Sequence, residues 1–308
     1  MAQLIKLQNY ISRYEWNIYR YPSQYIRLKQ DNWNKLLYLW NTDDGMTEEK
    51  DNEEEQKQSR FEKWKTFRKN KDEDEKMESE STVKRGLPQS EQELKQYFLN
   101  RLLPFQLKWA TSTVSNVSFM EKKYEEDVTL KYFLQRFPDT YLLMYYPIFH
   151  IKKAPVEGEI IFISPVGIEI IYLLEEDPQC VFTVQDERTW LKRNENKDSS
   201  ILSPFIALKR SERIVRGILN KYNVSFPITK TVLSRSNRID FISEPFNTKI
   251  IDKNSCKTWF ESRRSLVSPL KNQQLKAAEQ LLKYCQTTSV KRPEWEEDEQ
   301  TFTIVGEE

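Results

Sequence analysis

Glutamates on either side of one short turn are the residues whose type and spacing could best support chemistry. Glu159 precedes the apolar run 160–164, and Glu175 follows the apolar run 168–174 beyond the turn Pro165-Val166-Gly167. Carboxylates at the ends of adjacent strands can hold Mg²⁺, and metal-dependent phosphodiester cleavage usually adds a lysine that balances the charge developing on the phosphate. The pattern therefore predicts two strands that could bring acidic groups to a phosphodiester.

A structural interpretation of these acids stays open beside the chemical one. Glu157, Glu159 and Glu169 are all odd-numbered, so they can be the solvent-facing members of alternating strands in a half-exposed antiparallel sheet. Acidic residues at the start of a strand also protect an exposed sheet edge without doing chemistry.

Runs of apolar and β-prone residues, separated by short turns, predict the strands that position these acids. We expect strands at 141–151, 159–164, 168–174, 181–185, 229–233 and 239–242. The turn at 165–167 is short enough to make the second and third strands antiparallel neighbours. Helices are expected near 124–136, from Ser203-Pro204 to about Tyr222, at 255–264 and from Ser268-Pro269 onward. These elements predict a mixed α+β (α/β) fold.

Four regions follow one another along the chain. Residues 1–41 carry aromatic and apolar residues at helical spacing, which predicts N-terminal helices, and residues 42–86 alternate acids and bases as a charged linker does. Residues 87–286 hold the predicted α/β core and its C-terminal helices, starting with a capping pattern at Ser90. Residues 287–308 form an acidic tail.

The motifs within residues 124–235 resemble those of the nuclease-related domain (NERD) family. Glu126 matches that family's helix acid, Glu159 its strand aspartate and Ser164-Pro165-Val166-Gly167 its turn. Trp190 and the Ser203-Pro204 helix match later features of the pattern. The resemblance implies a restriction-endonuclease-like core, here an antiparallel meander flanked by helices, to which an N-terminal helical segment is added.

The chain departs from the family pattern where the catalytic glutamate and lysine should stand. Tyr172 and Leu174 occupy those positions, and neither can do the work of the residue it replaces. Glu126, Glu159 and Glu175 are therefore interpreted as vestigial catalytic acids. Glu175, Glu176, Lys152 and Lys153 lie close enough in sequence to act as migrated replacements, and in that case Glu159 and Glu175 would hold Mg²⁺. Otherwise no cofactor is expected.

A cluster of basic residues follows the predicted core strands. If these residues line one side of the core, they could bind phosphates of DNA or RNA without reading sequence. Alternatively, they are solvated side chains that pair with Glu212 and the acidic linker. The candidate binding residues are Lys209, Arg210, Arg213, Arg216, Arg235 and Arg238.

Charge and residue counts limit which binding partners, metal sites and cellular locations fit the chain. The net charge of +1 gives the 308-residue chain no strong overall field for nucleic acid or membranes, so any such contact must be local. A single histidine, His150, excludes multi-histidine metal sites. Three widely spaced cysteines fit reduced thiols in a cytoplasmic protein, and no apolar run is long enough to cross a membrane.

Three hypotheses remain. The first is a nuclease-fold protein, catalytically degenerate, that binds nucleic acid or a nucleic-acid-processing partner. The second is a structural or interaction module that holds a protein through its N-terminal helices or the apolar face of 270–285. The third is an active Mg²⁺-dependent nuclease with migrated residues.

Overall fold

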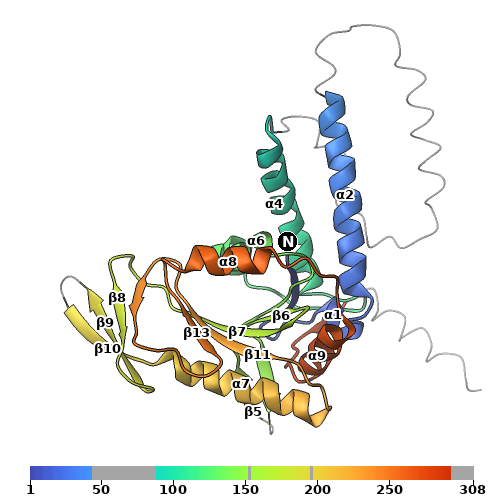
Figure 1. Ribbon diagram of the computed structural model, residues 1–308. Helices are drawn as coiled ribbons and strands as arrows, with labels where there is room; N and C mark the ends of the chain where they lie inside the picture. The colour runs from blue at the N-terminus through green and yellow to red at the C-terminus, as the bar shows by residue number, and fades with distance from the viewer. Residues whose placement is uncertain (44–87, 152–153, 195–196, 293–308) are drawn as a thin grey trace, which may run out of the picture. The chain divides into compact units, whose positions relative to one another are not determined.

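The computed structural model describes residues 1–43, 88–151, 154–194 and 197–292 (Figure 1). The chain divides into two compact units, one formed by Met1–Ile26 with Gln106–Glu308 and the other by Arg27–Phe105. The predicted linker (apart from its first two residues), Lys152, Lys153 and most of the predicted tail lie outside the described residues.

A six-stranded mixed sheet forms the centre of the first unit. Its order is β1-β3-β6-β7-β11-β13. The β3–β6 and β6–β7 pairs are antiparallel, whereas β1–β3, β7–β11 and β11–β13 are parallel. The mixed α+β class predicted from the sequence is confirmed. The strands span Gln3–Leu7 (β1), Leu142–Tyr145 (β3), Ile160–Ser164 (β6), Gly167–Leu173 (β7), Ile228–Leu233 (β11) and Thr248–Ile251 (β13).

The β6–β7 hairpin has the antiparallel pairing that its short turn predicts. The Ser164 hydroxyl donates to the Gly167 carbonyl at 2.9 Å and accepts from the Val166 amide at 3.3 Å. A Cβ at Gly167 would lie 3.0 Å from the Pro227 carbonyl oxygen, so this position favours glycine. The turn fixes the register in which Phe162 lies opposite Glu169.

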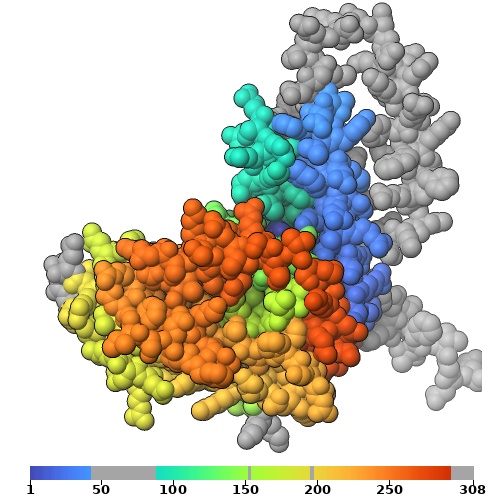
Figure 2. Space-filling model, viewed as in Figure 1, coloured from blue at the N-terminus to red at the C-terminus, as the bar shows by residue number. Residues whose placement is uncertain are grey.

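Helices cover both faces of this sheet (Figure 1). On one face lie α6 (Val128–Arg136) and α8 (Cys256–Arg264). Phe133 of α6 packs on Phe162, and Phe137, which follows α6, packs on both Phe162 and Trp259 of α8. On the other lie α7 (Pro204–Lys221) and α9 (Asn272–Lys283), which contact each other. The predicted start of α7 at Ser203-Pro204 is confirmed, and the Ser203 hydroxyl caps the helix by accepting from the Phe205 amide at 3.3 Å. On the face shown in Figure 2, atoms of the central strands are visible only in a recess between these helical segments.

Smaller elements complete the first unit. A four-stranded sheet has the order β10-β9-β8-β12, and β4 and β5 form an antiparallel hairpin. The bounds are Val181–Val184 (β8), Thr189–Asn194 (β9), Lys197–Leu202 (β10), Arg238–Asp240 (β12), Ile148–Ile151 (β4), Ala154–Glu157 (β5), Arg13–Trp16 (α1), Lys123–Glu126 (α5), Asn116–Val117 (β2) and Val290–Lys291 (β14).

The prediction of helices over residues 1–41 was wrong for the first residues of that region. Residues 3–7 form strand β1, which pairs in parallel with β3, and every one of its side chains is buried. Helical spacing of the apolar residues misled because polar residues also face inward here. The Gln3 amide donates to the Pro22 and Asp139 carbonyls, and the Lys6 ammonium pairs with Glu15. Both faces of this strand are buried, so its sequence does not alternate between apolar and polar residues as a half-exposed strand does.

The C-terminal helix also differs from the prediction. It begins at Asn272 rather than at Ser268-Pro269, and its residues Ala278, Leu281 and Leu282 are buried within the first unit. This apolar face is part of the core. It is therefore not an exposed surface for a partner, contrary to the sequence-based expectation for 270–285.

The second unit contains most of α2 (Tyr21–Asp43) and α4 (Glu91–Trp109). Trp33 packs on Phe98 with ring centroids 5.3 Å apart, and the Trp40 indole donates to the Pro88 carbonyl at 2.7 Å. The Ser90 hydroxyl accepts from the Glu93 amide at 3.3 Å, as the capping pattern predicts. Among the described residues, no helix is both long and apolar enough to span a membrane.

Candidate functional site

Glu159 lies at the start of β6, beneath α7. It immediately precedes the Ile160–Ile171 pair of the hairpin, and Tyr172 follows on the opposing strand. Only 8% of Glu159 is exposed. Its carboxylate lies 3.6 Å from the Arg210 guanidinium, and its backbone amide donates to the Ser211 hydroxyl at 3.3 Å. Two consecutive residues of α7 therefore hold the strand end that carries this acid.

Burial makes Glu159 a group that changes charge near neutral pH. Removal from water raises its pKa to about 7, and the nearby charge of Glu157 adds to this, while the Arg210 guanidinium acts in the opposite direction. Burial and the Glu159 charge also raise the pKa of Tyr172 and of Tyr146. The site thus combines one carboxyl poised between its two forms with two neutral phenols.

Tyr146 reaches this site because the chain breaks between β3 and β4. The sequence predicts one strand over 141–151, but Tyr146 has a φ of 46°, a left-handed conformation that non-glycine residues seldom adopt. The chain then turns into the β4–β5 hairpin, where Gly158 packs closely on Phe149. The sequence carries no glycine that would mark this break, so periodicity alone could not reveal it.

Glu175 is held in a different place, at the ends of β7 and β11. Both its oxygens accept from the Arg235 guanidinium, and Oε1 also accepts from the Arg235 backbone amide at 3.2 Å. The same guanidinium lies 4.6 Å from the Tyr132 ring centroid. A bidentate pair stacked on an aromatic ring is a fixed arrangement that joins two strand ends.

Glu126 is exposed on α5, and the next residue takes the inward position. The Asp127 carboxylate caps α6 by accepting from the Thr129 and Leu130 amides, and it accepts from the Tyr145 hydroxyl at 2.8 Å. In the part of the chain that the structure describes, no three His, Cys, Asp or Glu side chains gather as a metal ion would require. The predicted acids Glu126, Glu159 and Glu175 are not brought together, and they do not fit a shared Mg²⁺.

The interpretation of the odd-numbered glutamates as solvent-facing was wrong for two of them. Glu157 is exposed, but Glu159 and Glu169 are both buried. Glu169 accepts hydrogen bonds from Thr231, Trp259 and Arg263. Burial alone would raise the pKa of Glu169, but the hydrogen bonds and the charge of Arg263, together with the hydrogen bonds from Thr231 and Trp259, lower it.

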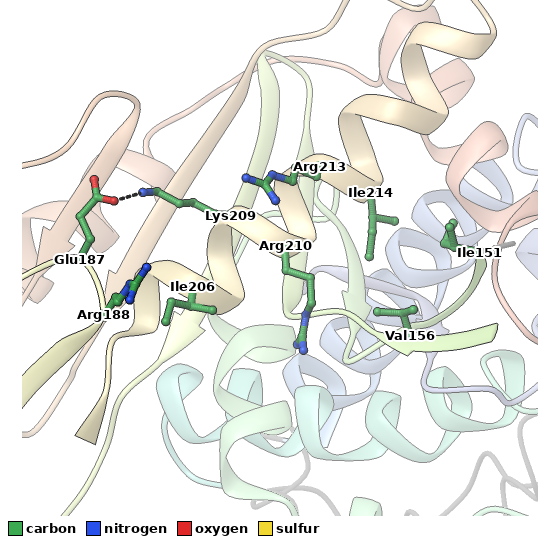
Figure 3. Close-up of a pocket in the computed structure, with 9 residues that line it drawn as sticks. All are labelled: Ile151, Val156, Glu187, Arg188, Ile206, Lys209, Arg210, Arg213 and Ile214. Carbon is green, nitrogen blue, oxygen red and sulfur yellow. Dashed lines mark hydrogen bonds and ion pairs between the residues drawn. The ribbon is translucent and has the colours of Figure 1, made fainter. Parts of the chain in front are cut away.

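The basic residues predicted to bind phosphate separate into a local group and isolated pairs. Lys209, Arg210 and Arg213 line one cavity of about 580 Å³ beside α7 (Figure 3). By contrast, Arg216 pairs with Glu212 at 2.7 Å, Arg235 pairs with Glu175, and Arg238 pairs with Asp240 at 2.7 Å. Half of the predicted cluster therefore shares a site.

The cavity contains residues that the sequence did not single out. Figure 3 shows Arg188 beside Ile206, while Lys209 extends to Glu187, with which it forms an ion pair of 2.8 Å. The apolar lining comes from α7 and from the β4–β5 hairpin: Ile151, Val156, Ile206 and Ile214. Asp186 could have indicated a turn at Arg188 from the sequence, because aspartate side chains commonly accept from backbone amides two or three residues later in turns. The Asp186 carboxylate does accept from the Arg188 and Thr189 amides.

Comparison with known proteins adds little to this geometry. No family model matches the chain, and no solved structure matches it. A protein of Geobacillus stearothermophilus named RNA 2',3'-cyclic phosphodiesterase is 50% identical over 40 residues, which are 13% of this chain and 13% of the relative. The chain thus matches about an eighth of that relative's length, which does not place it in a family.

Proposed function

We propose that this protein binds nucleic acid through its phosphates and does not cleave it. The observation that carries the proposal is the cavity beside α7, whose charged lining consists of four basic residues, Arg188, Lys209, Arg210 and Arg213, and one acid, Glu187. Guanidinium and ammonium groups grouped in this way suit phosphate, because each guanidinium offers several donors in a fixed plane. Such contacts bind a backbone of any sequence.

The order of elements supports a restriction-endonuclease-like core of the nuclease-related domain type. The helical segment with Glu126, the β6–β7 hairpin, Trp190 on β9 and the helix α7 occur in the chain in this order. This is the order that the motif resemblance implies. The family assignment remains part of the proposal.

Loss of cleavage is proposed from what occupies the strand ends. Glu159 faces Arg210, Tyr172 stands where a second carboxylate would be needed, and Glu175 is engaged by Arg235. A divalent cation entering here would have to replace an arginine at each carboxylate, and like charges disfavour that exchange.

The test measures binding and cleavage on the same samples. RNA is the first nucleic acid to try, since the short match is to a protein whose name includes RNA; single- and double-stranded DNA follow. Affinity is measured by fluorescence anisotropy between 50 and 300 mM salt, and cleavage with Mg²⁺ or Mn²⁺. We expect affinity to fall steeply with salt and no product to form.

Matched variants locate the binding surface. Arg213→Ala should weaken binding to all sequences and reduce the salt slope by about 1. Arg238→Ala removes an arginine that pairs with Asp240 and does not line the cavity, so it should leave both unchanged. Cleavage that disappears in Glu159→Ala would overturn the proposal in favour of an active nuclease.

A second candidate, a protein-interaction module, is favoured by one observation on α2. Tyr38 and Leu39 on this helix are 71% and 45% exposed, although both are large and apolar. Absence of salt-sensitive binding to any nucleic acid would move the assignment to this candidate.

A further inference from the structure

A second cavity adjoins the cation-lined one. It has a volume of about 260 Å³ and shares two residues, Glu187 and Lys209, with the first. The ion pair between these two side chains therefore forms the boundary between the cavities. Both of its members are substantially exposed, with side-chain exposures of 75% for Glu187 and 41% for Lys209. Exposed pairs of this kind contribute little stability, so a phosphate can compete for Lys209.

The second cavity differs from the first in its lining. Phe205 and Leu208 of α7 are buried residues that line it, and Phe246, which also lines it, is 89% exposed. Lys230 also lines it, but this ammonium is engaged by Glu212. One cavity therefore offers cations, and its neighbour offers apolar and aromatic surface.

Phe246 is held in this position by the loop that carries it. Thr248 donates from its hydroxyl to the Phe246 carbonyl at 3.2 Å and from its amide to the Pro245 carbonyl at 3.0 Å. The Glu244 carboxylate accepts from the Ile250 amide at 2.8 Å. The 89% exposed Phe246 ring therefore adds little to the core, and as part of the cavity lining it offers an aromatic surface to a ligand.

We propose that the ligand is single-stranded nucleic acid, with a base stacked on Phe246 and a neighbouring phosphate in the cation-lined cavity. This deepens the proposed function and rests on it. An exposed aromatic ring can stack on any unpaired base, whereas the bases of a duplex are already stacked on each other. A phosphate cavity beside an aromatic residue therefore selects single strands over duplexes without selecting sequence.

The test compares Phe246→Ala with a matched control. Phe119 is 81% exposed and lines neither cavity, so Phe119→Ala removes the same surface elsewhere. Binding of a single-stranded 12-mer and of the duplex of the same sequence is measured for each protein. We expect Phe246→Ala to weaken single-strand binding about tenfold or more, with an unchanged salt slope and unchanged duplex binding. Phe246→Trp should retain or strengthen single-strand binding, and Phe119→Ala should have no effect.

The outcomes separate this inference from the function on which it rests. Absence of salt-sensitive binding to any nucleic acid overturns both. Salt-sensitive binding that Phe246→Ala leaves unchanged, or weakens equally for single strands and duplex, overturns only the stacking. Because Ile242 in the same loop is also fully exposed, vesicles containing anionic lipid are tested in parallel. Vesicle binding that Phe246→Ala abolishes, without an effect on single strands, would assign the loop to a membrane surface instead.

Discussion

Two glutamates of the β6–β7 hairpin are equally shielded from solvent yet differ in their hydrogen-bond partners and in their pKa. Glu159 and Glu169 are each 8% exposed. Glu169 accepts four hydrogen bonds, and its pKa lies below the usual value, whereas Glu159 has one arginine at 3.6 Å, and its pKa is raised to about 7. Low solvent exposure alone does not decide the state of a carboxylate; the number and geometry of its partners do.

The difference follows from the two faces of one sheet. Glu169 lies opposite Phe162 and faces α8, which supplies Trp259 and Arg263. Glu159 faces α7, where the nearest cation, Arg210, is half-exposed and also lines the cavity beside that helix. On the α8 face, the buried Glu169 carboxylate has a full set of hydrogen-bond partners, which stabilises the fold. On the α7 face, the buried Glu159 carboxyl has one arginine near it, and such incompletely partnered carboxyls are common in binding and catalytic sites.

The largest expected effect is on the satisfied face. Glu169→Ala leaves the Arg263 guanidinium, Thr231 and Trp259 without their acceptor, and breaking such a pair is strongly destabilising. Because Arg263 is partly exposed, we expect a loss of about 2–3 kcal/mol in the free energy of unfolding, measured by urea denaturation. Glu187→Ala, which removes an exposed glutamate, is the control and should change stability by less than about 0.5 kcal/mol. A loss as small as the control's would remove the basis of the comparison.

On the α7 face of the sheet, by contrast, we expect a substitution of the buried glutamate to stabilise the protein. The pKa of Glu159 rises from 4.5 to about 7 on folding, so the folded protein holds more protons than the unfolded chain between these values. The stability that comes from the protonated, buried Glu159 is fully present below the unfolded pKa of 4.5 and is lost as the pH rises through about 7. Glu159→Gln removes the ionisation and should stabilise the protein at pH 8 by about 1–2 kcal/mol while changing it little at pH 5.

The measurement for Glu159→Gln is the free energy of unfolding at several pH values between 4 and 9. Its control is Glu157→Gln, a neighbouring exposed carboxyl, which should leave the pH profile of the wild-type protein intact. Equal stabilities of wild type and Glu159→Gln at pH 8 would show that the two buried glutamates do not differ as proposed.

Local turn and capping chemistry made part of this molecule predictable from its sequence. The 165–167 turn predicted the β6–β7 pairing, and Ser203-Pro204 predicted the start of α7, because both depend on residues a few positions apart. The sequence misled for β1, whose buried Gln3 and Lys6 find partners far along the chain. The periodicity of apolar residues cannot reveal a buried polar residue whose hydrogen-bond partners lie far away in the sequence.

The candidate site was less predictable than the fold for the same reason. Glu169 was interpreted as a solvent-facing residue because its partners Trp259 and Arg263 come from a helix about 90 positions later. Arg210 was predicted to bind phosphate, but its contact with Glu159 depends on how α7 lies across β6. Residue types indicated which groups were available, and only the packing of helices on the sheet decided which of them meet.

The smallest expected effect tests whether Arg210 links the buried carboxyl to the cavity. The guanidinium lowers the pKa of Glu159, so Arg210→Ala should raise that pKa further above 7 and move the descending part of the stability profile to higher pH. The side chain is 53% exposed, so the free energy of unfolding at pH 8 should fall by less than about 1 kcal/mol. Arg216→Ala, which removes a similarly exposed arginine paired with Glu212, should leave the profile in place. A profile that moves equally in both variants would mean that Glu159 responds to the general charge of α7 rather than to Arg210, and that its state is independent of what the cavity binds.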